Sequence, residues 1–385
     1  MSDDVLVRVR HAALHPNVRR SPYFPATEAV GAVEYLVYNH MYMPIDYGRA
    51  PEEDYAALME RVTLWDVGAE RQAEVRGPDA LTFADSLSCR DLSGLKVGDC
   101  RYTMVCDDGG RIMTECIVLR VAEDVVWFSH GDVDLLLWAR GLAMGQGTSV
   151  EVSEPDVAPL QIQGPRSGDV LESLAGAAAK NLAPFTCTDG EIQGIDVIVS
   201  RTGWSGELGY EVYPRSSERA MDLWRAIVET GEGHGMLVTG PNLIRACERG
   251  ITDTHYFVGA GMTPFEAGVG WAVDLDAGPF VGRDALRAVA ARTPVRHSVG
   301  MVAVEREPFP RFETFWPVED EHGEVGHVRW TAQSIALGRP IAIGLVDARV
   351  QDGDSVRIRH PSGDAPARVT GLPIAPRTPP TTASA

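Results

Sequence analysis

The stretch SRTGWSGELGYEV, residues 200–212, carries the most information about the fold. Its glycines Gly203, Gly206 and Gly209 are spaced three residues apart, which allows the backbone to turn tightly and to approach a ligand closely. Glu207 would project a carboxylate from this loop, and a carboxylate can accept two parallel N–H groups from one planar ring. A glycine-rich hairpin with an exposed Glu207 fits the same spacing, so the rest of the chain must decide.

Length and charge limit the class of protein. A chain of 385 residues exceeds the usual size of one hydrophobic core, so we expect two or three domains. The net charge of −19, from 54 acidic and 35 basic residues, would repel a phosphate backbone, so we expect no nucleic-acid partner. The N-terminus is acidic rather than basic, and no run of about 18 apolar residues follows. We therefore expect a cytoplasmic protein with no membrane segment.

Several cofactor classes are disfavoured by missing residues. The six cysteines form no C-x-x-C pair, and the histidines are dispersed except for His11 and His15, which are four residues apart near the N-terminus, so we expect no metal. The only lysines are Lys96 and Lys180, and Lys180 lies in an alanine-rich stretch, which disfavours pyridoxal phosphate. There is no Walker A motif, no G-x-G-x-x-G and no H-E-x-x-H. Glu207 stands where a nucleophile elbow needs glycine, which disfavours a serine hydrolase.

The hydrophobic pattern predicts a mixed α and β chain without internal repeats. Helices are expected after Gly77-Pro78 and at residues 132–144, 217–230 and 242–251, and strands at residues 102–106, 112–121 and 125–129. Short alternating segments between residues 298 and 358 indicate a small β-rich domain. Residues 1–30 lack periodicity and should wrap the surface, while residues 373–385 should form a disordered tail without a catalytic role.

Blocks along nearly the whole chain resemble the glycine cleavage T-protein family. Residues 200–212 closely resemble its signature, and similar blocks occur as MPIDY at residues 43–47, LWDV at 64–67, GPDA at 77–80 and FVGRDAL at 280–286. Within this superfamily, YNHM at residues 38–41 and SEPDV at 153–157 resemble the dimethylsulfoniopropionate demethylase branch more than the T-protein branch.

The resemblance implies an α+β fold, a three-domain cloverleaf ring of the T-protein type with a small C-terminal β-barrel-like domain. It also implies tetrahydrofolate as the cofactor, bound in a central channel. The expected first domain, which binds folate, combines residues 1–64 with 156–255. The second combines residues 65–155 with 256–290, the third covers 291–372, and residues 373–385 form the tail.

For tetrahydrofolate, Glu207 is the predicted anchor of the pterin ring, because its carboxylate can accept from a ring N–H and the neighbouring amine. The residues of this chain at positions that resemble the family's folate contacts add further candidates: Trp204, Tyr102, Arg201, Glu248 and Met43.

The predicted catalytic residues include a departure from the family. T-proteins carry an Asp-Asp pair where this chain has Thr114-Glu115, so the candidates are Glu115, Thr114 and Tyr102. Release of an aminomethyl carbon needs a positioned acid or base, and loss of the aspartate disfavours that reaction. Methyl transfer from a sulfonium or quaternary ammonium needs less, because the leaving group departs neutral and alignment supplies much of the acceleration. An ether donor would need a proton or a metal for its leaving group.

Aromatic side chains suit a cationic methyl donor, since their faces attract positive charge. The predicted substrate contacts are three aromatic residues and a histidine in a stretch that departs from both relatives: Tyr38, Trp65, Tyr23 and His255.

The leading hypothesis is a tetrahydrofolate-dependent methyltransferase or demethylase that moves a methyl group between a small methylated substrate, favoured as a sulfonium or ammonium compound, and N5 of tetrahydrofolate. Two alternatives stay open: an aminomethyl- or hydroxymethyl-transferase of a biosynthetic pathway, with Glu115 in place of the missing aspartate, and a non-catalytic folate-binding protein. The expected partner is a small methylated molecule, and the chain is expected to be a monomer or homodimer. The direction of transfer and the identity of the donor stay open.

Overall fold

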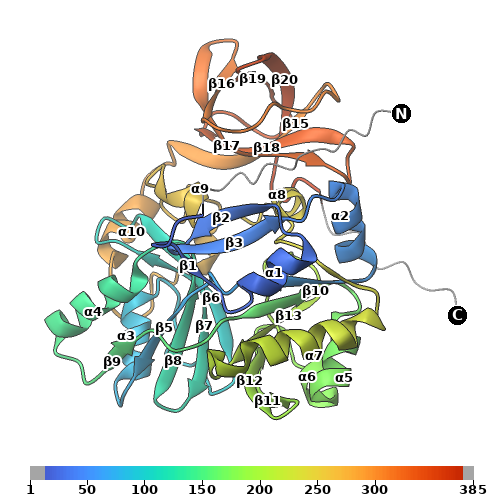
Figure 1. Ribbon diagram of the computed structural model, residues 1–385. Coiled ribbons are helices and arrows are strands. Elements are labelled where there is room, and N and C mark those ends of the chain that lie inside the picture. Colours follow the sequence, from blue (N-terminus) through green and yellow to red (C-terminus); the bar gives the residue numbers. More distant parts are fainter. Residues whose placement is uncertain (1–13, 376–385) are drawn as a thin grey trace, which may run out of the picture.

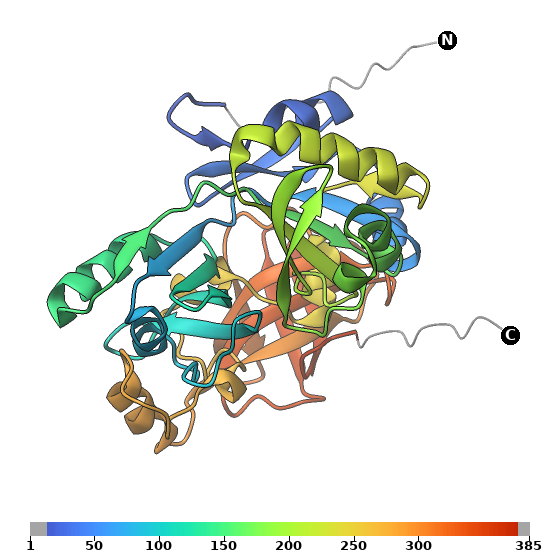
Figure 2. The same ribbon diagram turned by 90° about the horizontal axis from the view of Figure 1, so that it is seen from below.

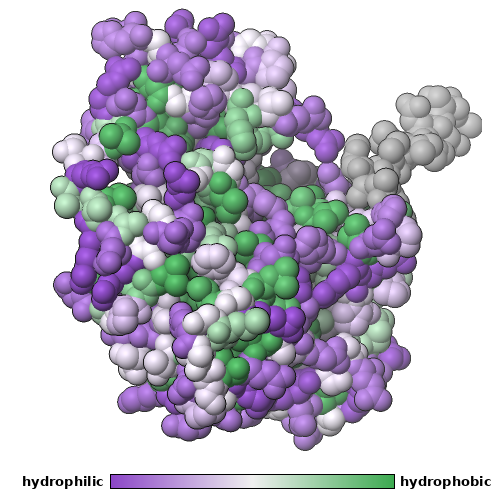
Figure 3. All heavy atoms as spheres, turned by 90° about the vertical axis from the view of Figure 1, so that its left-hand side faces the viewer, coloured by the Kyte–Doolittle hydropathy of each residue, from purple (hydrophilic) through white to green (hydrophobic). Residues whose placement is uncertain are grey.

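The computed structural model describes residues 14–375 and consists of a two-sheet body with a closed barrel on one side (Figure 1). No helix among these residues is long and apolar enough to cross a bilayer. Hydrophilic side chains cover most of the face seen in Figure 3, in keeping with the net charge of −19.

The first sheet has six strands in the order β11-β12-β13-β10-β4-β14. Its strands are β4 (Val62–Asp66), β10 (Leu160–Gln163), β11 (Cys187–Ile192), β12 (Ile195–Ser200), β13 (Gly209–Pro214) and β14 (Met236–Val238). The helices α5 (Ser167–Ala175), α6 (Ala177–Lys180) and α7 (Ala220–Glu232) accompany it, and apolar residues of α7 share a core with strand residues. The helix predicted at residues 217–230 is confirmed; it begins with a 3-10 turn at Ser217–Arg219.

Residues near the N-terminus belong to the core of this sheet, which corrects the expectation that residues 1–30 wrap the surface. Residues 1–13 lie outside the described part of the chain. A small sheet of β1 (Arg19–Arg20), β2 (Glu34–Tyr38) and β3 (Met41–Asp46) accompanies α1 (Phe24–Val30) and α2 (Pro51–Glu60). Tyr23 and Phe24 are almost fully buried, and Tyr23 stacks on Trp224 of α7. Figure 2 shows α7 alongside these N-terminal elements. Tyr23 and Phe24 thus give the start of helix α1 a buried face, which the sequence pattern of residues 1–30 did not indicate.

The second sheet has the strand order β6-β7-β8-β5-β9. Its elements are β5 (Gln72–Arg76), β6 (Cys100–Cys106), β7 (Ile112–Ala122), β8 (Val125–His130), β9 (Glu151–Ser153), α3 (Ala80–Leu87) and α4 (Leu135–Gln146). The strands predicted at residues 102–106, 112–121 and 125–129 are confirmed. The helix predicted from residue 132 begins at Leu135 instead.

The barrel closes in the order β15-β18-β17-β16-β19-β20. Its strands are β15 (Arg296–Ala303), β16 (Trp316–Asp320), β17 (Gly323–Ser334), β18 (Arg339–Asp347), β19 (Ser355–His360) and β20 (Gly363–Thr370), and the helices α8 (Leu243–Arg249), α9 (Thr254–Val258) and α10 (Arg283–Ala290) precede it in the chain. Two residues of α8 and α9, Cys247 and Phe257, share a core with barrel residues such as Ile343.

Two predicted boundaries differ from the elements of the structure. Strand β4 crosses the boundary placed between residues 64 and 65, and all of β4 pairs within the first sheet. The start of the predicted disordered tail is ordered: Ile374 and Ala375 are buried, and the Ala375 N–H donates to the Glu248 carbonyl oxygen at 2.9 Å. The apolar Ile374 packs into the core between α8, α9 and the barrel. Residues 376–385 lie outside the described part of the chain.

Candidate active site

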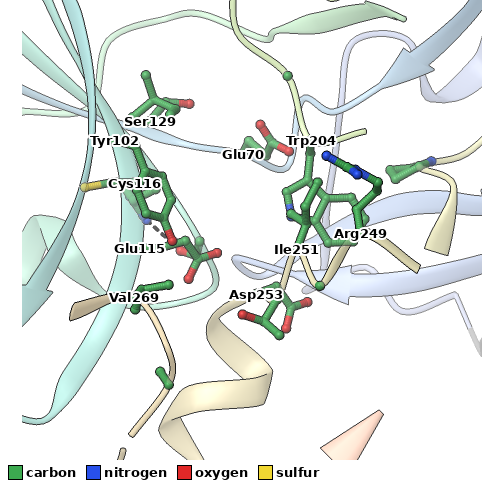
Figure 4. A pocket seen from close by; sticks show the side chains of 18 of the residues that line it. Glu70, Tyr102, Glu115, Cys116, Ser129, Trp204, Arg249, Ile251, Asp253 and Val269 are labelled. Carbon is green, nitrogen blue, oxygen red and sulfur yellow. Dashed lines mark hydrogen bonds between the residues drawn. The ribbon is translucent and has the colours of Figure 1, made fainter. Parts of the chain in front are cut away.

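A cavity of about 600 Å³ lies where the two sheets, the β2–β3 hairpin and the segments around α8 and α9 meet (Figure 4). Its walls combine residues that are far apart in the sequence, from Leu36 to Pro373. The segment that the sequence predicted to be a disordered tail therefore contributes Pro373 to the wall of the cavity.

One wall is a face of the second sheet. The register places Tyr102 of β6 opposite Ile117 of β7, and Ile117 opposite Ser129 of β8. Since side chains alternate along a strand, Glu115 lies on the same face as Ile117, and all four residues line the cavity. Thr114 points to the other face, where its hydroxyl lies 3.0 Å from that of Thr254. The structure thus brings the predicted catalytic residues Glu115 and Tyr102 into the cavity, but not Thr114.

Glu115 lies beside a second carboxylate that the sequence reasoning missed. Asp253, which also lines the cavity, caps α9 by accepting from the Tyr256 N–H, and the hydroxyl of Thr254 donates to Glu115 Oε2 at 2.9 Å. Burial, reinforced by the negative charge of Asp253, raises the pKa of Glu115 to about 8. Glu115 is therefore mostly protonated at neutral pH and can hold or release a proton there.

The opposite wall contains a second acidic group, centred on Glu211 of β13. Gln161 of β10 lies directly opposite and donates through Nε2 to Glu211 Oε1 at 2.7 Å. The hydroxyls of Tyr213 and Thr202 donate to Oε2. Gln161 Nε2 also lies 3.4 Å from both carboxylate oxygens of Glu70. Three acceptor-bearing side chains, those of Glu70, Gln161 and Glu211, thus meet in the cavity wall.

The pKa values of these two glutamates are raised. For Glu211 the cause is burial, and for Glu70 it is burial followed by the negative charges of Glu211 and Glu115. The sequence reasoning did not select Glu70, Gln161 or Glu211, although Glu211 lies in the signature stretch. The one available signal was the alternation of side-chain directions along β13, which places Glu211 and Tyr210 on opposite faces of the sheet.

Three predicted folate contacts have partners elsewhere in the protein and do not line the cavity. Glu207 accepts from Nη2 and Nε of Arg245 at 2.6 and 3.1 Å. Glu248 is fully buried and accepts from Tyr55, Arg245 and the barrel residue Ser334. Arg201 donates to the Leu182 carbonyl oxygen at 2.7 Å. Their roles toward a ligand stay predictions, and the contacts seen here tie the signature loop and the barrel to the body.

The glycines of the signature make room for a side chain of the protein rather than only for a ligand. A Cβ on Gly203 or Gly209 would meet the side chain of Gln163 at 2.2 or 2.1 Å. Gly206 adopts a φ of +71°, in the left-handed region that favours glycine. Gln163 in turn accepts from the hydroxyl of Ser205 at 2.7 Å, so the glycines shape the loop around a buried amide.

Aromatic residues line two sides of the cavity. Trp204 stacks on the barrel residue Trp330, with ring centroids 5.9 Å apart, and Tyr102 stacks on Trp271 at 5.6 Å. Tyr38 and Met43, which the sequence predicted to contact ligands, also line the cavity. Trp271 and Trp330 were missed, because nothing in their local sequence separates them from other aromatic residues.

Three predicted substrate contacts lie away from the cavity wall. Tyr23 is a core residue whose hydroxyl donates to the Ala158 carbonyl oxygen at 2.9 Å. Trp65 is fully buried beside Leu58 and Val67. His255 lies behind the wall, where its Nε2 is 2.7 Å from Asp132 and its ring meets that of Tyr38 edge-on. No group of side chains among residues 14–375 has the arrangement of a metal site.

The two sheets, the closed C-terminal barrel and an acidic, aromatic cavity at their junction define an α+β protein that binds a small molecule. A family model described as the GCVT N-terminal domain matches residues 23–277, and one described as the glycine cleavage T-protein C-terminal barrel domain matches residues 296–375. The chain therefore belongs to the glycine cleavage T-protein family.

Individual relatives agree with this. The chain is 33% identical over 361 residues to dimethylsulfoniopropionate demethylase DmdA of Ruegeria pomeroyi, covering 93% of this chain and 98% of the relative. It is 32% identical over 345 residues to an aminomethyltransferase of Streptomyces coelicolor, covering 86% and 91%. The crystal structure of the glycine cleavage system aminomethyltransferase T from Bartonella henselae matches with a TM-score of 0.83 at 22% identity, covering 93% of this chain and 98% of that one. The predicted fold is confirmed.

Proposed function

We propose that this protein is a tetrahydrofolate-dependent transferase that moves a methyl group between a small sulfonium or quaternary ammonium compound and N5 of tetrahydrofolate. Family membership supports the one-carbon transferase class and tetrahydrofolate as the cofactor. The name of the relative from Ruegeria pomeroyi supports a methyl group as the carbon unit.

The acceptor cluster of Glu70, Gln161 and Glu211 is the observation that carries the proposal. A pterin ring presents N–H and amino donors along one edge, and buried carboxylates are their natural acceptors. Burial raises the pKa values of Glu70 and Glu211, and the negative charge of Glu211 adds to the shift of Glu70, so a ligand that brings several N–H groups would offset the cost of burying these carboxylates. The acceptors present in the cavity therefore fit the N–H and amino groups of the pterin, with Glu211 in the role that the sequence assigned to Glu207.

The remaining cavity residues fit a small cation. Tyr102, which stacks on Trp271, offers aromatic surface, and Asp253 offers a carboxylate. Figure 4 shows Tyr102, Glu115 and Asp253 facing a common space. Tetrahydrofolate supplies the nucleophilic nitrogen, and the walls of the cavity align the donor and exclude water.

Proton balance gives Glu115 a role. Transfer of a methyl group from a cationic donor to an N–H nitrogen produces a neutral leaving group and releases one proton. The deprotonated form of Glu115, a minority at neutral pH because its pKa is about 8, can accept that proton. The leaving group itself needs no acid, which agrees with the absence of the family's aspartate at Thr114.

Mass spectrometry of tetrahydrofolate after anaerobic incubation with the protein and a panel of donors tests the proposal. The panel contains sulfonium, quaternary ammonium and aryl ether compounds. Methylated folate from a sulfonium or ammonium donor is expected, and the Glu211→Gln variant should form much less. Methylation from the aryl ether alone would contradict the donor class. Folate binding without any product would instead support a non-catalytic folate-binding protein.

Aminomethyl or hydroxymethyl transfer is the second candidate. Relatives named aminomethyltransferase and a Glu115 carboxyl that is protonated at neutral pH favour it, since that chemistry needs an acid or base. A requirement for a lipoyl carrier protein, or for folate carrying carbon at the formaldehyde level, would identify this reaction. In that case Glu115→Gln should abolish turnover, whereas a sulfonium reaction should only be slowed.

A further inference from the structure

The charges in the cavity are distributed unevenly. Among the described lining residues, four are acidic (Glu70, Glu115, Glu211 and Asp253), and Arg249 is the only arginine or lysine. The one lining histidine, His130, has its pKa lowered to about 4 by burial, so it is neutral at neutral pH. The raised pKa values of Glu70, Glu115 and Glu211 favour their neutral forms, so a ligand that enters this cavity meets an acidic lining in which Asp253 is the remaining carboxylate.

The single cation lies away from the part of the cavity assigned to the donor. We define the donor end by Tyr102, Glu115, Asp253, Val269 and Trp271, all of which line the cavity. Figure 4 shows Arg249 beside Trp204 and Ile251, across the cavity from Tyr102 and Glu115. Arg249 also packs on the signature loop, where a Cβ on Gly206 would meet its Nε at 3.1 Å. This places Arg249 where it can serve the carboxylates of a folate tail.

Two further cations lie close to the donor end, but neither lines it. His255 Nε2 is 2.7 Å from Asp132 and its Nδ1 is 3.7 Å from Asp253, so one imidazolium is shared by two carboxylates and a negative charge remains. Arg90 donates to the Tyr102 carbonyl oxygen at 3.1 Å, and its guanidinium lies over the ring of Trp271, 5.4 Å from its centroid. Neither leaves a cationic side chain facing the donor in the cavity wall.

We propose that the methyl donor is a net cation that carries no carboxylate, such as a sulfonium or ammonium compound with a neutral alcohol or amide end. The inference rests on the proposed function. A carboxylate at the donor end would lie near Asp253 without an arginine or lysine facing it among the described lining residues, and burying an unpaired charge beside a like charge is unfavourable. The positive centre alone is attracted by the carboxylate of Asp253 and by the ring of Tyr102. Zwitterionic betaines should therefore be poor donors.

A matched pair of donors tests the charge directly. Dimethylsulfoniopropionamide and dimethylsulfoniopropionate have nearly the same size and the same sulfonium group, and they differ in the charge of the distal end. The measurement is kcat/KM for formation of methylated tetrahydrofolate by the full-length protein at fixed ionic strength. We expect the amide to exceed the carboxylate by at least about tenfold, the size expected for one unfavourable charge contact.

The Asp253→Asn variant identifies the origin of this preference. Asparagine is as good a helix cap as aspartate, so α9 should keep its N-terminus. The variant should lower kcat/KM for the amide donor, raise it for the carboxylate donor, and so reduce the ratio between them. Asp134→Asn, at an exposed carboxylate that pairs with His40 and does not line the cavity, should leave the ratio unchanged.

Binding provides a readout that needs no turnover. Tetramethylammonium should compete with the sulfonium donor, and its Kd from calorimetry should rise in Asp253→Asn, whereas propionate should not compete. A carboxylate donor that reacts as well as the amide would overturn the inference and leave the proposed methyl transfer standing. If neither donor, nor any other cation of the panel, gives methylated folate, the proposed function fails and the inference fails with it.

Discussion

Glu207 and Arg245 form an ion pair at 2.6 Å in which the arginine side chain is 1% exposed and the glutamate side chain 10% exposed. The carboxylate that the signature loop presents thus faces helix α8, and the same guanidinium reaches Glu248 at 2.9 Å. The loop is fixed to α8 by charge, and the glutamate two residues beyond Gly209 is the one that faces the cavity.

Glu207→Gln should therefore lower stability more than ligand affinity. The substitution removes a charge-assisted contact to a buried arginine that keeps Glu248 as its other partner, so we expect a loss of about 1.5 to 3 kcal/mol in the free energy of unfolding. Urea denaturation measures this loss, and calorimetry with tetrahydrofolate provides the comparison. Unchanged stability together with a large loss of folate affinity would instead support Glu207 as the pterin anchor.

Glu211→Gln should show the opposite pattern. The amide keeps the size of the side chain but loses the charge that would accept from a pterin edge, so tetrahydrofolate should bind roughly 10- to 100-fold more weakly. Stability should change less, or rise, because burial already disfavours the charged form of Glu211. Quenching of Trp204 fluorescence offers a titration signal, and wild-type affinity in this variant would argue against the acceptor cluster as the pterin site.

Glu115 makes stability depend on pH in a defined window. Its pKa is raised to about 8 in the folded protein from an ordinary value near 4.5. Between these values the folded protein holds a proton that the unfolded chain has released, so stability contributed by Glu115 falls as pH rises from about 5 to about 8. Glu115→Gln does not titrate. The stability of the wild type relative to this variant should decline across that window, and a constant difference in urea unfolding would show that the pKa is not raised.

Gly209 is required because of Gln163, and a double-mutant cycle can demonstrate it. Gly209→Ala should destabilise the protein by about 1 to 3 kcal/mol, since its Cβ would lie 2.1 Å from Gln163 Oε1. Gln163→Ala removes the obstruction at the cost of the contact with Ser205. The double variant should be more stable than the sum of the single losses predicts, by at least about 1 kcal/mol. Simple additivity would mean that the glycine serves another purpose.

The secondary structure around the cavity could be predicted where local pattern dominates. Strands β6 to β8 are runs rich in apolar and β-branched residues, separated by a turn at residues 107–110, and the resemblance then located Tyr102 and Glu115 on them. The choice between Glu207 and Glu211 could not be made in the same way. Both carboxylates belong to one signature, and which of them faces the cavity depends on the pairing of β13 with β10, a contact between residues 50 positions apart.

The predicted aromatic contacts divide between the core and the cavity wall. Nothing in the sequence separates Tyr23 and Trp65 from Tyr38 and Trp204, since all four are aromatic residues in segments that resemble the family. A buried aromatic residue can face either a core or a cavity, and only tertiary packing decides between them. Asp253 was missed because it acts on Glu115 from a different segment. The order of residues 373–375 was hidden by the Pro- and Thr-rich residues that follow, since one apolar side chain, Ile374, fixes the segment.

The cavity wall runs from Leu36 of β2 to Pro373, just beyond the last barrel strand. During translation the chain leaves the ribosome from its N-terminus, and the body sheets emerge long before the barrel. The part of the wall that Leu372 and Pro373 contribute can therefore pack only after the barrel strands have been synthesised. A chain that has not yet reached Pro373 lacks this part of the wall, so it offers tetrahydrofolate fewer contacts than the complete cavity does.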